Sequence, residues 1–460
     1  MQPHQQQSTR RNFLKQSAAV GAGFWVAGGI APRVSAAANE QLQIAKIGVA
    51  GGKGASDLKY ASGFGKIHAV CDVDRRFLEG ASKLFKADHK FTDYREMFDQ
   101  LGDKLDVAVI STPDHTHAVM ASKAMKMGKH VYVQKPLTHS IWEARELQKI
   151  AKETGVATQM GNQYTAYEPM RQAAYRVKAG QVGTVKEVHV WTNRPVWDQG
   201  IDRPKSAPVP KHVDWESWIG PAPFREYADG VYHNFQWRGW WDFGTGSLGD
   251  MACHTCNLPF MALNMRNPTA VEGSSSGHNK DSYPKTSKIV FDFPELDGRA
   301  PFKLFWSDKS QLPPEELYAE FLEKKNADGS PRTLALSGCL IVGDKCTLYA
   351  AGDYAQDGIE LSGGVEWMDV EFPKAPGSTP DATGTELSHV TEFYNAIRNP
   401  KEQPMSNIPN YGGPLTETIL LGNLAVWNGG RVEWDAATLT PSDKSLMAIV
   451  KPEYRDGYEV

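Results

Sequence analysis

IAKIGVAGGKGASDLKYASGFGKIHAVCD, residues 44–72, is the stretch that decides the fold. It opens with an apolar run, 44–50, that is typical of a buried strand, and it passes through a glycine-rich turn into a helical pattern from Ala55. A second strand, 67–71, follows and ends at Asp72. This order predicts a dinucleotide-binding unit, in which a strand, a glycine-rich turn, a helix, a second strand and an acid follow one another.

The glycine-rich turn predicts the kind of cofactor. Glycine lets the backbone approach a pyrophosphate, and the N-terminus of the following helix faces its negative charge. The glycines predicted to contribute are Gly48, Gly51, Gly52 and Gly54. Asp72 lies close to the ~20-residue offset of an acid that binds a ribose hydroxyl, and its charge would repel a 2′-phosphate. We therefore expect NAD rather than NADP. The alternative is that Asp72 or Asp74 only caps the next helix.

The alternation of strands and helices continues downstream, which predicts an α/β Rossmann domain over residues 40–160. Further strands are expected at 106–110, 130–133 and 156–160, with helices at 118–127 and 142–153. Ligands bind such sheets at the carboxyl ends of the strands, where polar loops occur here. The candidate cofactor ligands in these loops are Ser111, Thr112, Pro113, His115, His117, Gln134, Lys135, Asn162 and Gln163.

Several motifs together resemble the Gfo/Idh/MocA family of nicotinamide-dependent sugar oxidoreductases. They are the glycine-rich turn, CDVD at 71–74, STPDHTH at 111–117, VYVQKP at 131–136, MGNQ at 160–163 and GDMACH at 249–254. The resemblance extends over residues 42–430. Two features depart from it: Gln134 stands where the family usually has Glu, and the glycine-rich turn is one residue longer.

The resemblance implies a catalytic group of Lys135, Asp250 and His254. Lys135 would bind and polarise the reacting oxygen, helped by a peptide before Pro136 that is often cis in the family. His254 would act as general base or acid, and Asp250 would hold the substrate or the imidazole. A helix over 250–263 puts Asp250 and His254 on one face, and histidine titrates near neutrality. In the alternative interpretation, Lys135-Pro136 is a turn, Asp250 caps the helix and His254 is a core residue bonded to the backbone.

A tryptophan-rich segment lies between Lys135 and the Asp250/His254 pair. The chain has 13 Trp, and many of them fall within 191–241. Aromatic rings stack on the C–H faces of sugars, and a few placed polar groups bind the hydroxyls. The candidate substrate ligands are Tyr164, Arg194, Trp197, Trp241 and Asp242. In the alternative interpretation the tryptophans pack the sheet and the domain interface, which we expect of at least half of them.

Residues 161–460 are predicted to form a substrate-binding α+β domain. Strands are expected at 186–191, 288–293, 302–306, 339–342 and 346–350, and 313–325 is expected to be a helix or an insertion. Helices at 386–397 and 416–426 are expected to pack back on the body. The resemblance implies an open, mainly antiparallel sheet, with one face closing over the nicotinamide and the other able to form a homo-oligomer.

Residues 1–36 are predicted to be a twin-arginine signal peptide. TRRNFLK at 9–15 precedes a short apolar stretch of small residues and a VSA site at 34–36. The apolar stretch is shorter than the ~20 residues of a spanning helix, although an uncleaved anchor is the alternative. Export to the periplasm by the twin-arginine machinery favours a folded protein with a tightly bound cofactor. The leader carries four basic residues and no acid, so cleavage changes the formal net charge from −4 to −8.

Composition excludes several other classes. The acidic balance and the lack of a basic run argue against a nucleic-acid partner. Five cysteines are not a disulfide framework, and Cys253 and Cys256 lack a second pair for a zinc site, so they are expected to be packing residues. No metal is expected.

Three functions are compatible with these features. The first is an NAD-dependent oxidoreductase acting on a sugar or glycoside hydroxyl, with C3 as the specific expectation. The second is a glycosidase that uses transient oxidation and elimination, which needs an extra base such as Tyr164. The third is a non-catalytic sugar-binding protein of the same fold, for which Gln134 is the main support.

Overall fold

The computed structural model describes residues 41–326 and 328–460, so the predicted signal peptide lies outside the described residues. The first sheet is parallel, with strand order β3-β2-β1-β4-β5-β6. Its strands are β1 (Leu42–Ile47), β2 (Gly65–Cys71), β3 (His89–Phe91), β4 (Val107–Ile110), β5 (His130–Val133) and β6 (Thr158–Met160). The helices between them are α2 (Gly51–Ser62), α3 (Arg75–Phe85), α4 (Tyr94–Leu101), α5 (Asp114–Lys126) and α6 (Ile141–Thr154). This strand order is that of a dinucleotide-binding fold.

Two helices of this domain begin earlier than the sequence predicts. Helix α2 starts at Gly51 rather than Ala55, so three of the predicted turn glycines belong to its first turn. Helix α5 starts at Asp114 rather than 118, directly after Pro113. An acid in the first turn is favoured by the helix dipole, which explains the earlier start of α5.

Asp72 and Asp74 have different roles. Asp74 is the N-cap of α3 and accepts a hydrogen bond from the Arg76 amide at 3.0 Å. Asp72 instead accepts from the amides of Val49 and Asp74, each at 2.9 Å. The capping interpretation is therefore right for Asp74, while Asp72 lies beside the glycine-rich turn.

The second sheet is mixed and mainly antiparallel, with order β13-β12-β11-β7-β10-β9-β8-β14-β15, and its one parallel pairing among the described residues joins β7 and β10. Its strands are β7 (Val185–Trp191), β8 (Ala270–Ser275), β9 (Ser287–Phe293), β10 (Phe302–Ser307), β11 (Gly338–Gly343), β12 (Thr347–Ala351), β13 (Gly358–Leu361), β14 (Arg431–Asp435) and β15 (Thr440–Pro441). The predicted fold class, a Rossmann domain followed by a mainly antiparallel sheet domain, is confirmed.

The predicted helix over 250–263 is two helices. α9 (Gly246–Thr255) and α10 (Asn257–Leu263) meet at Cys256. Pro259 lies in the first turn of α10, where proline is tolerated. In a continuous helix its ring would clash with the carbonyl of Thr255, so the break falls before it.

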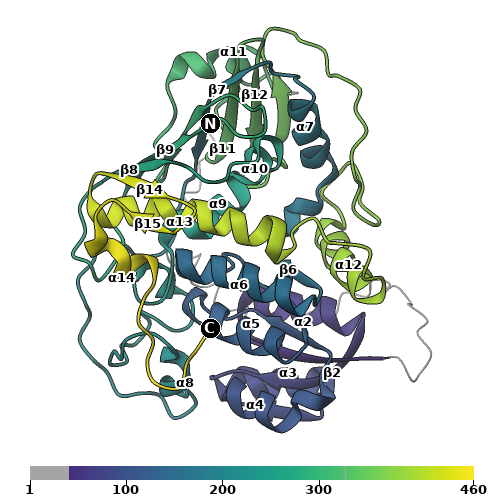
Figure 1. Cartoon of the computed structure of the whole chain (residues 1–460), viewed down its shortest axis with the longest axis vertical. Coiled ribbons are helices and arrows are strands. Elements are labelled where there is room, and N and C mark those ends of the chain that lie inside the picture. The colour runs from purple at the N-terminus through teal and green to yellow at the C-terminus, as the bar shows by residue number, and fades with distance from the viewer. Residues whose placement is uncertain (1–40, 327) are drawn as a thin grey trace, which may run out of the picture.

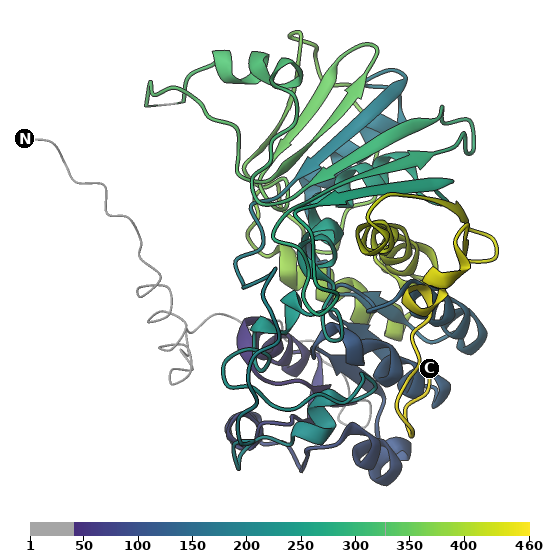
Figure 2. The same cartoon turned by 90° about the vertical axis from the view of Figure 1, so that its left-hand side faces the viewer.

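The remaining α-helices follow β6 in the chain. They are α7 (Glu168–Lys178), α8 (Trp215–Ile219), α11 (Ala319–Glu323), α12 (Thr385–Arg398), α13 (Gly413–Asn428) and α14 (Met447–Val450). Figures 1 and 2 show α13 at the junction, with the second sheet on one side and the Rossmann domain on the other. Arg145 of α6 pairs with Glu417 of α13 at 2.6 Å, and Lys53 of α2 pairs with Glu386 of α12 at 3.0 Å.

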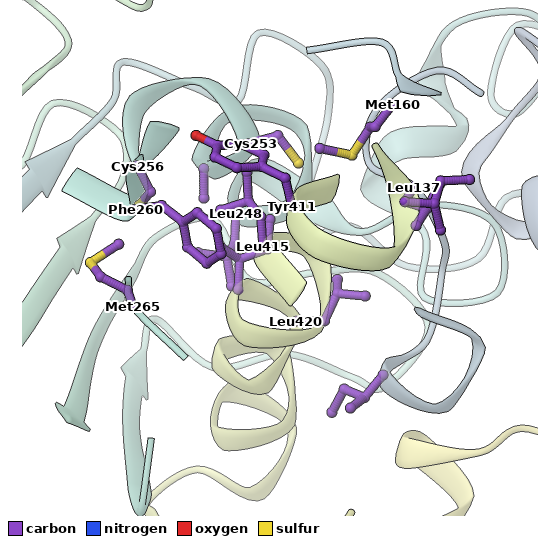
Figure 3. Packing of buried hydrophobic residues seen from close by; sticks show 14 of the residues in the cluster. Leu137, Met160, Leu248, Cys253, Cys256, Phe260, Met265, Tyr411, Leu415 and Leu420 are labelled. Carbon is purple, nitrogen blue, oxygen red and sulfur yellow. The ribbon is translucent and has the colours of Figure 1, made fainter. Parts of the chain in front are cut away.

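The main hydrophobic core is continuous across this junction. Figure 3 shows Leu415 and Leu420 of α13 among Leu248, Cys253, Cys256 and Phe260 of α9 and α10. Cys253 and Cys256 are thus buried packing residues, as predicted. Among residues 41–326 and 328–460, no helix is long and apolar enough to cross a membrane.

Candidate active site and cofactor cleft

A cavity of about 360 Å³ lies at the carboxyl ends of β1, β2, β4 and β5. The predicted cofactor ligands that line it are Gly48, Gly51, Gly52, Gly54, Asp72, Ser111, Thr112, Pro113, Gln134 and Lys135. The loops that follow β1, β2, β4 and β5 therefore meet in one cleft, as the topology requires.

The glycine-rich turn forms a cradle that side chains would fill. Gly48 has φ +76°, and a Cβ there would lie 2.4 Å from the Ser111 carbonyl oxygen. A Cβ at Gly51 or Gly52 would meet no atom within 4 Å, so the cradle is open on that side. Ala50 is the N-cap of α2 and provides no side-chain cap, which leaves first-turn amides for an anion. These features fit a pyrophosphate.

Asp72 is held at the edge of the cradle by the two amides that it accepts from. Burial raises the pKa of its carboxyl, while the amides of Asp74 and Val49 and nearby His233 lower it. Each carboxylate oxygen keeps a further acceptor position, because one hydrogen bond uses only one of its lone pairs.

Lys135 connects the cleft to the second domain. Its Nζ donates to Asp250 Oδ1 at 2.8 Å and to the Asp250 carbonyl at 2.7 Å, and its peptide with Pro136 is cis. Arg238 Nε donates to the same Oδ1 at 3.2 Å. Burial raises the pKa of Asp250, but Lys135 and Arg238 outweigh it and hold that pKa well below its usual range. Asp250 is therefore an ionised carboxylate between two cations.

His254 follows Asp250 by one turn of α9. Its side chain is 2% exposed, and Nδ1 has no hydrogen-bond partner among the residues that the structure describes. Burial, then Lys135, Lys53 and Arg194, lower the pKa of His254 well below 6.5, against the opposing effect of Asp250. The imidazole is neutral at neutral pH. Asp250 is the fifth residue of α9 and not a cap, and His254 Nδ1 is not satisfied by the backbone.

Asp114 is a further acid of the cleft that the sequence did not single out. It lines the cavity and accepts from Thr245 Oγ1 at 2.7 Å. Burial raises its pKa to about 6, partly offset by the Thr245 bond and by Arg238 and Lys135.

Four predicted cofactor ligands lie outside the cavity lining. The two ring nitrogens of His115 lie 3.1 Å from the carbonyl oxygens of Phe243 and Trp218, and those of His117 lie 2.8 Å from the carbonyl oxygens of Pro136 and Thr112. Burial lowers the pKa of both imidazoles, so each neutral ring donates one hydrogen bond to one of its two carbonyls. The prediction that His115 and His117 contact the cofactor is therefore corrected, because both rings bond to backbone and neither lines the cavity. Asn162 and Gln163 are buried, with Asn162 Nδ2 and Gln163 Oε1 unpartnered in the described chain.

The candidate substrate ligands separate into two places. Tyr164 stacks on Tyr354 with ring centroids 4.3 Å apart, and Tyr354 lies edge-on to His254 at 4.7 Å. Arg194 pairs with the adjacent Asp353 at 2.9 Å. Tyr164 and Arg194 are thus near His254, while Trp197 is buried against Phe235.

Trp241 and Asp242 lie elsewhere. They line a separate cavity of about 600 Å³ together with Trp427 and Tyr454. Trp241 stacks on Tyr283 at 3.7 Å, and Asp242 pairs with Arg225. Because their side chains point to this second cavity and not to Lys135, the prediction that they bind substrate beside the catalytic group is corrected.

Besides Asp114, sequence reasoning missed three further contributors to the site. Arg238 is stacked on Trp237, with its guanidinium carbon 4.2 Å from the ring centroid, and contacts Asp250. Tyr354 reaches His254 from the turn after β12, and Tyr458 of the C-terminal tail lines the cofactor cavity. Of these three residues, only Arg238 could have been found from the sequence, because it adjoins the tryptophans that precede the GDMACH motif. Among the described residues, no group of three or more His, Cys, Asp or Glu could hold a metal.

Two family models match the chain. Residues 42–162 match the Gfo/Idh/MocA oxidoreductase family, NAD-binding Rossmann fold, and residues 180–298 match the C-terminal alpha/beta domain of that oxidoreductase family. Together they span more than half of the 460 residues.

Curated relatives and solved structures agree with these matches. The chain is 30% identical over 128 residues to scyllo-inositol 2-dehydrogenase (NAD(+)) of Bacillus subtilis, covering 28% of this chain and 31% of that protein. It is 34% identical over 171 residues to a glycosyl hydrolase family 109 protein of Saccharopolyspora erythraea, covering 32% and 37%. The chain therefore spans about a third of the length of these relatives.

A solved structure shares the fold over most of its length. The WlbA dehydrogenase of Bordetella pertussis, in complex with NADH and UDP-GlcNAcA, superposes with a TM-score of 0.57 at 17% identity. The superposition covers 86% of this chain and 99% of that one, which shows a common fold. With both domains matched in order, the chain belongs to the Gfo/Idh/MocA oxidoreductase family.

Proposed function

We propose that this protein is an NAD-dependent oxidoreductase that moves a hydride between a hydroxyl of a sugar or polyol and the nicotinamide. The observation that carries the proposal is the position of Lys135. It lines the nucleotide cleft, and its Nζ lies 2.8 Å from Asp250 Oδ1. One helical turn after Asp250 comes the neutral His254, whose Nδ1 has no hydrogen-bond partner among the described residues. Oxidation of an alcohol needs these two groups, a donor for the oxygen and a base for its proton.

NAD fits the cleft through the open glycine cradle, the uncapped N-terminus of α2 and Asp72. When bound, the nicotinamide supplies the chemistry of accepting or donating hydride. The Trp218 and Phe235 side chains and the C-terminal Tyr458 line the same cavity, which supports a tightly held cofactor.

Lys135 and His254 supply the groups that hold the reacting oxygen and exchange its hydroxyl proton. Lys135 Nζ has three N–H groups, and two are used by the Asp250 carbonyl and carboxylate, so the third can hold the reacting oxygen. His254 can take the hydroxyl proton during oxidation, because its imidazole is neutral. In the reverse direction the imidazolium, which must first gain a proton, returns that proton to the oxygen. Asp250 keeps Lys135 in place and stays ionised.

A small carbohydrate or polyol is the substrate class that we propose. The Tyr164–Tyr354 pair offers an aromatic surface beside His254, and the Arg194–Asp353 pair supplies polar groups. The relative named scyllo-inositol 2-dehydrogenase supports a cyclic polyhydroxy compound. Within this class we propose C3 of a glycoside as the oxidised carbon, following the family resemblance.

A redox-assisted glycosidase is the second candidate, favoured by the similarity to the glycosyl hydrolase family 109 protein. It needs an extra base near Lys135 or His254. Tyr164 is a poor choice, because burial and the nearby Glu386 and Asp357 raise its pKa. Purified protein tests the two candidates: net NADH formation from a sugar supports the dehydrogenase, and release of an aglycone without net NADH supports the glycosidase.

We also propose that the protein is exported to the periplasm by the twin-arginine pathway, for which the motif at 9–15 is the support. A cofactor loaded before export agrees with a cofactor cavity that the C-terminal Tyr458 helps to line. Homo-oligomer formation through the second sheet stays a prediction.

Replacing Asp72 with serine is expected to weaken NAD binding about tenfold and to reduce the preference for NAD over NADP. The variant loses the acceptor for a ribose hydroxyl and the charge that repels a 2′-phosphate. Calorimetric titration with each dinucleotide measures both effects. Asp99→Ser, on the surface of α4, is the control, and an unchanged NAD/NADP ratio in Asp72→Ser would contradict the assigned role.

A further inference from the structure

Behind the wall of the cofactor cleft lies a buried carboxylate that no part of the proposed reaction uses. Asp57 of α2 is 4% exposed. Its Oδ2 accepts from Ser111 Oγ at 2.6 Å and from Gln134 Nε2 at 2.8 Å. Ser111 follows β4, Gln134 follows β5, and both line the cavity, whereas Asp57 does not. Asp57 therefore joins the helix that begins at the glycine cradle to the ends of two strands.

A buried lysine accompanies this carboxylate. The side chain of Lys46 on β1 is fully buried, and its Nζ donates to the carbonyls of Gly48 at 2.6 Å and Ile47 at 3.1 Å. Burial lowers the pKa of Lys46 to about 8, while Asp57 and Asp72 raise it. A buried cation requires a nearby anion, and Asp57 is one of the two. Its charge thus supports the ammonium that holds the Gly48 carbonyl.

Gln134 can donate a hydrogen bond to Asp57 only because its side chain is an amide. Its NH₂ donates to Asp57, while its Oε1 faces the backbone N–H of Lys135 at 3.4 Å. The space around it is full, since a Cβ on Gly161 would lie 2.6 Å from Gln134 Nε2. A glutamate at 134 would bring a second carboxylate oxygen to about the same place, with no donor for Asp57 and little room to turn away.

We propose that Asp57 is a positioning residue of the cofactor cleft, and that it, and not residue 134, supplies the carboxylate of the cluster formed with Ser111 and Gln134. The pair needs one carboxylate and one amide, so the amide at 134 is required by the acid at 57. Gln134 is then a matched partner, and its departure from the usual Glu of the family does not indicate loss of function. The proposal concerns the shape of the cleft and would stand if the proposed reaction were wrong.

The test is a charge exchange between the two positions. We expect Gln134→Glu to raise the Kd for NAD about tenfold at pH 8 and to lower the Tm. We expect the double variant Asp57→Asn/Gln134→Glu to return both values close to those of the native protein, because one carboxylate and one amide are present again. The matched control is Gln159→Glu, a buried glutamine on β6 that contacts the His389 carbonyl, which Asp57→Asn should not rescue.

The pH dependence separates this role from a packing defect. In Gln134→Glu the two acids would share a proton at low pH, so NAD binding is expected to recover as the pH falls and to weaken again as it rises. The other titratable groups around Asp57 are common to every variant: Lys46, Tyr60, Asp72, Tyr132 and Tyr394. The double variant should lose this pH dependence.

The Kd for NAD and the Tm of the single and double variants decide between the two roles of Asp57, positioning and packing. Recovery in the double variant supports the proposal, including the case in which Gln134→Glu alone does not fold and the double variant does. Native affinity and Tm for Gln134→Glu at all pH values would overturn it. Equal damage in the single and double variants, or failure of both to fold, would overturn it as well.

Discussion

Replacing Lys135 with methionine is expected to reduce turnover by about 10³-fold or more while NAD binding changes only a few fold. Methionine keeps much of the length of the side chain but removes the ammonium that donates to Asp250 and to the reacting oxygen. The loss should appear in kcat, because the interaction with the oxygen grows as charge develops on it. Single-turnover kinetics, followed by NADH absorbance, measures it.

The control for this variant is Lys123→Met on α5. Lys123 pairs with Asp99 at the surface and contacts neither the cleft nor Asp250. Turnover of this control should equal that of the native protein. Native turnover in Lys135→Met would contradict the role assigned to Lys135.

The second large effect is expected at His254. Changing it to asparagine should lower kcat about 10²-fold to 10³-fold, because the hydroxyl proton loses its base. The pKa of His254 lies well below 6.5 through burial and three nearby cations, so the imidazole stays neutral as the pH falls from about 8 to about 6.

This position of the pKa predicts the pH profile. His254 should cause no loss of kcat/KM between about pH 8 and about pH 6 in the native protein. We assign any change of kcat/KM near pH 6 to Asp114, because burial raises the pKa of this carboxyl to about 6. The same change should persist in His254→Asn. A native limb near pH 6.5 that disappears in the variant would show that His254 titrates there and would contradict the neutral-imidazole account.

The Rossmann half could be predicted because its signals are local. An apolar run such as Val107–Ile110 is buried on both faces of a parallel sheet and needs no alternation to be recognised. Position 48 requires glycine, because its φ is positive and a Cβ would collide with the Ser111 carbonyl oxygen. The sequence therefore reveals the turn. Strand topology then fixes which loops meet.

The rest of the site depends on contacts between distant segments. Tyr354 reaches His254 from a turn 100 residues further along the chain, and no local pattern marks it. The sequence places His115 and His117 among the cofactor ligands because their loop follows a strand. In the structure, α5 begins at Asp114 and both rings face backbone carbonyls. Trp241 and Asp242 have the expected residue types, yet they line the other cavity.

The most direct test of the central claim is the NADH absorbance of native protein mixed with NAD and a panel of sugars, glycosides and inositols. The account predicts that at least one of these compounds produces NADH and its oxidised product in equal amounts, and that Lys135→Met produces neither. Saturable binding of a sugar and of NAD with no transfer of hydride in either direction would contradict it.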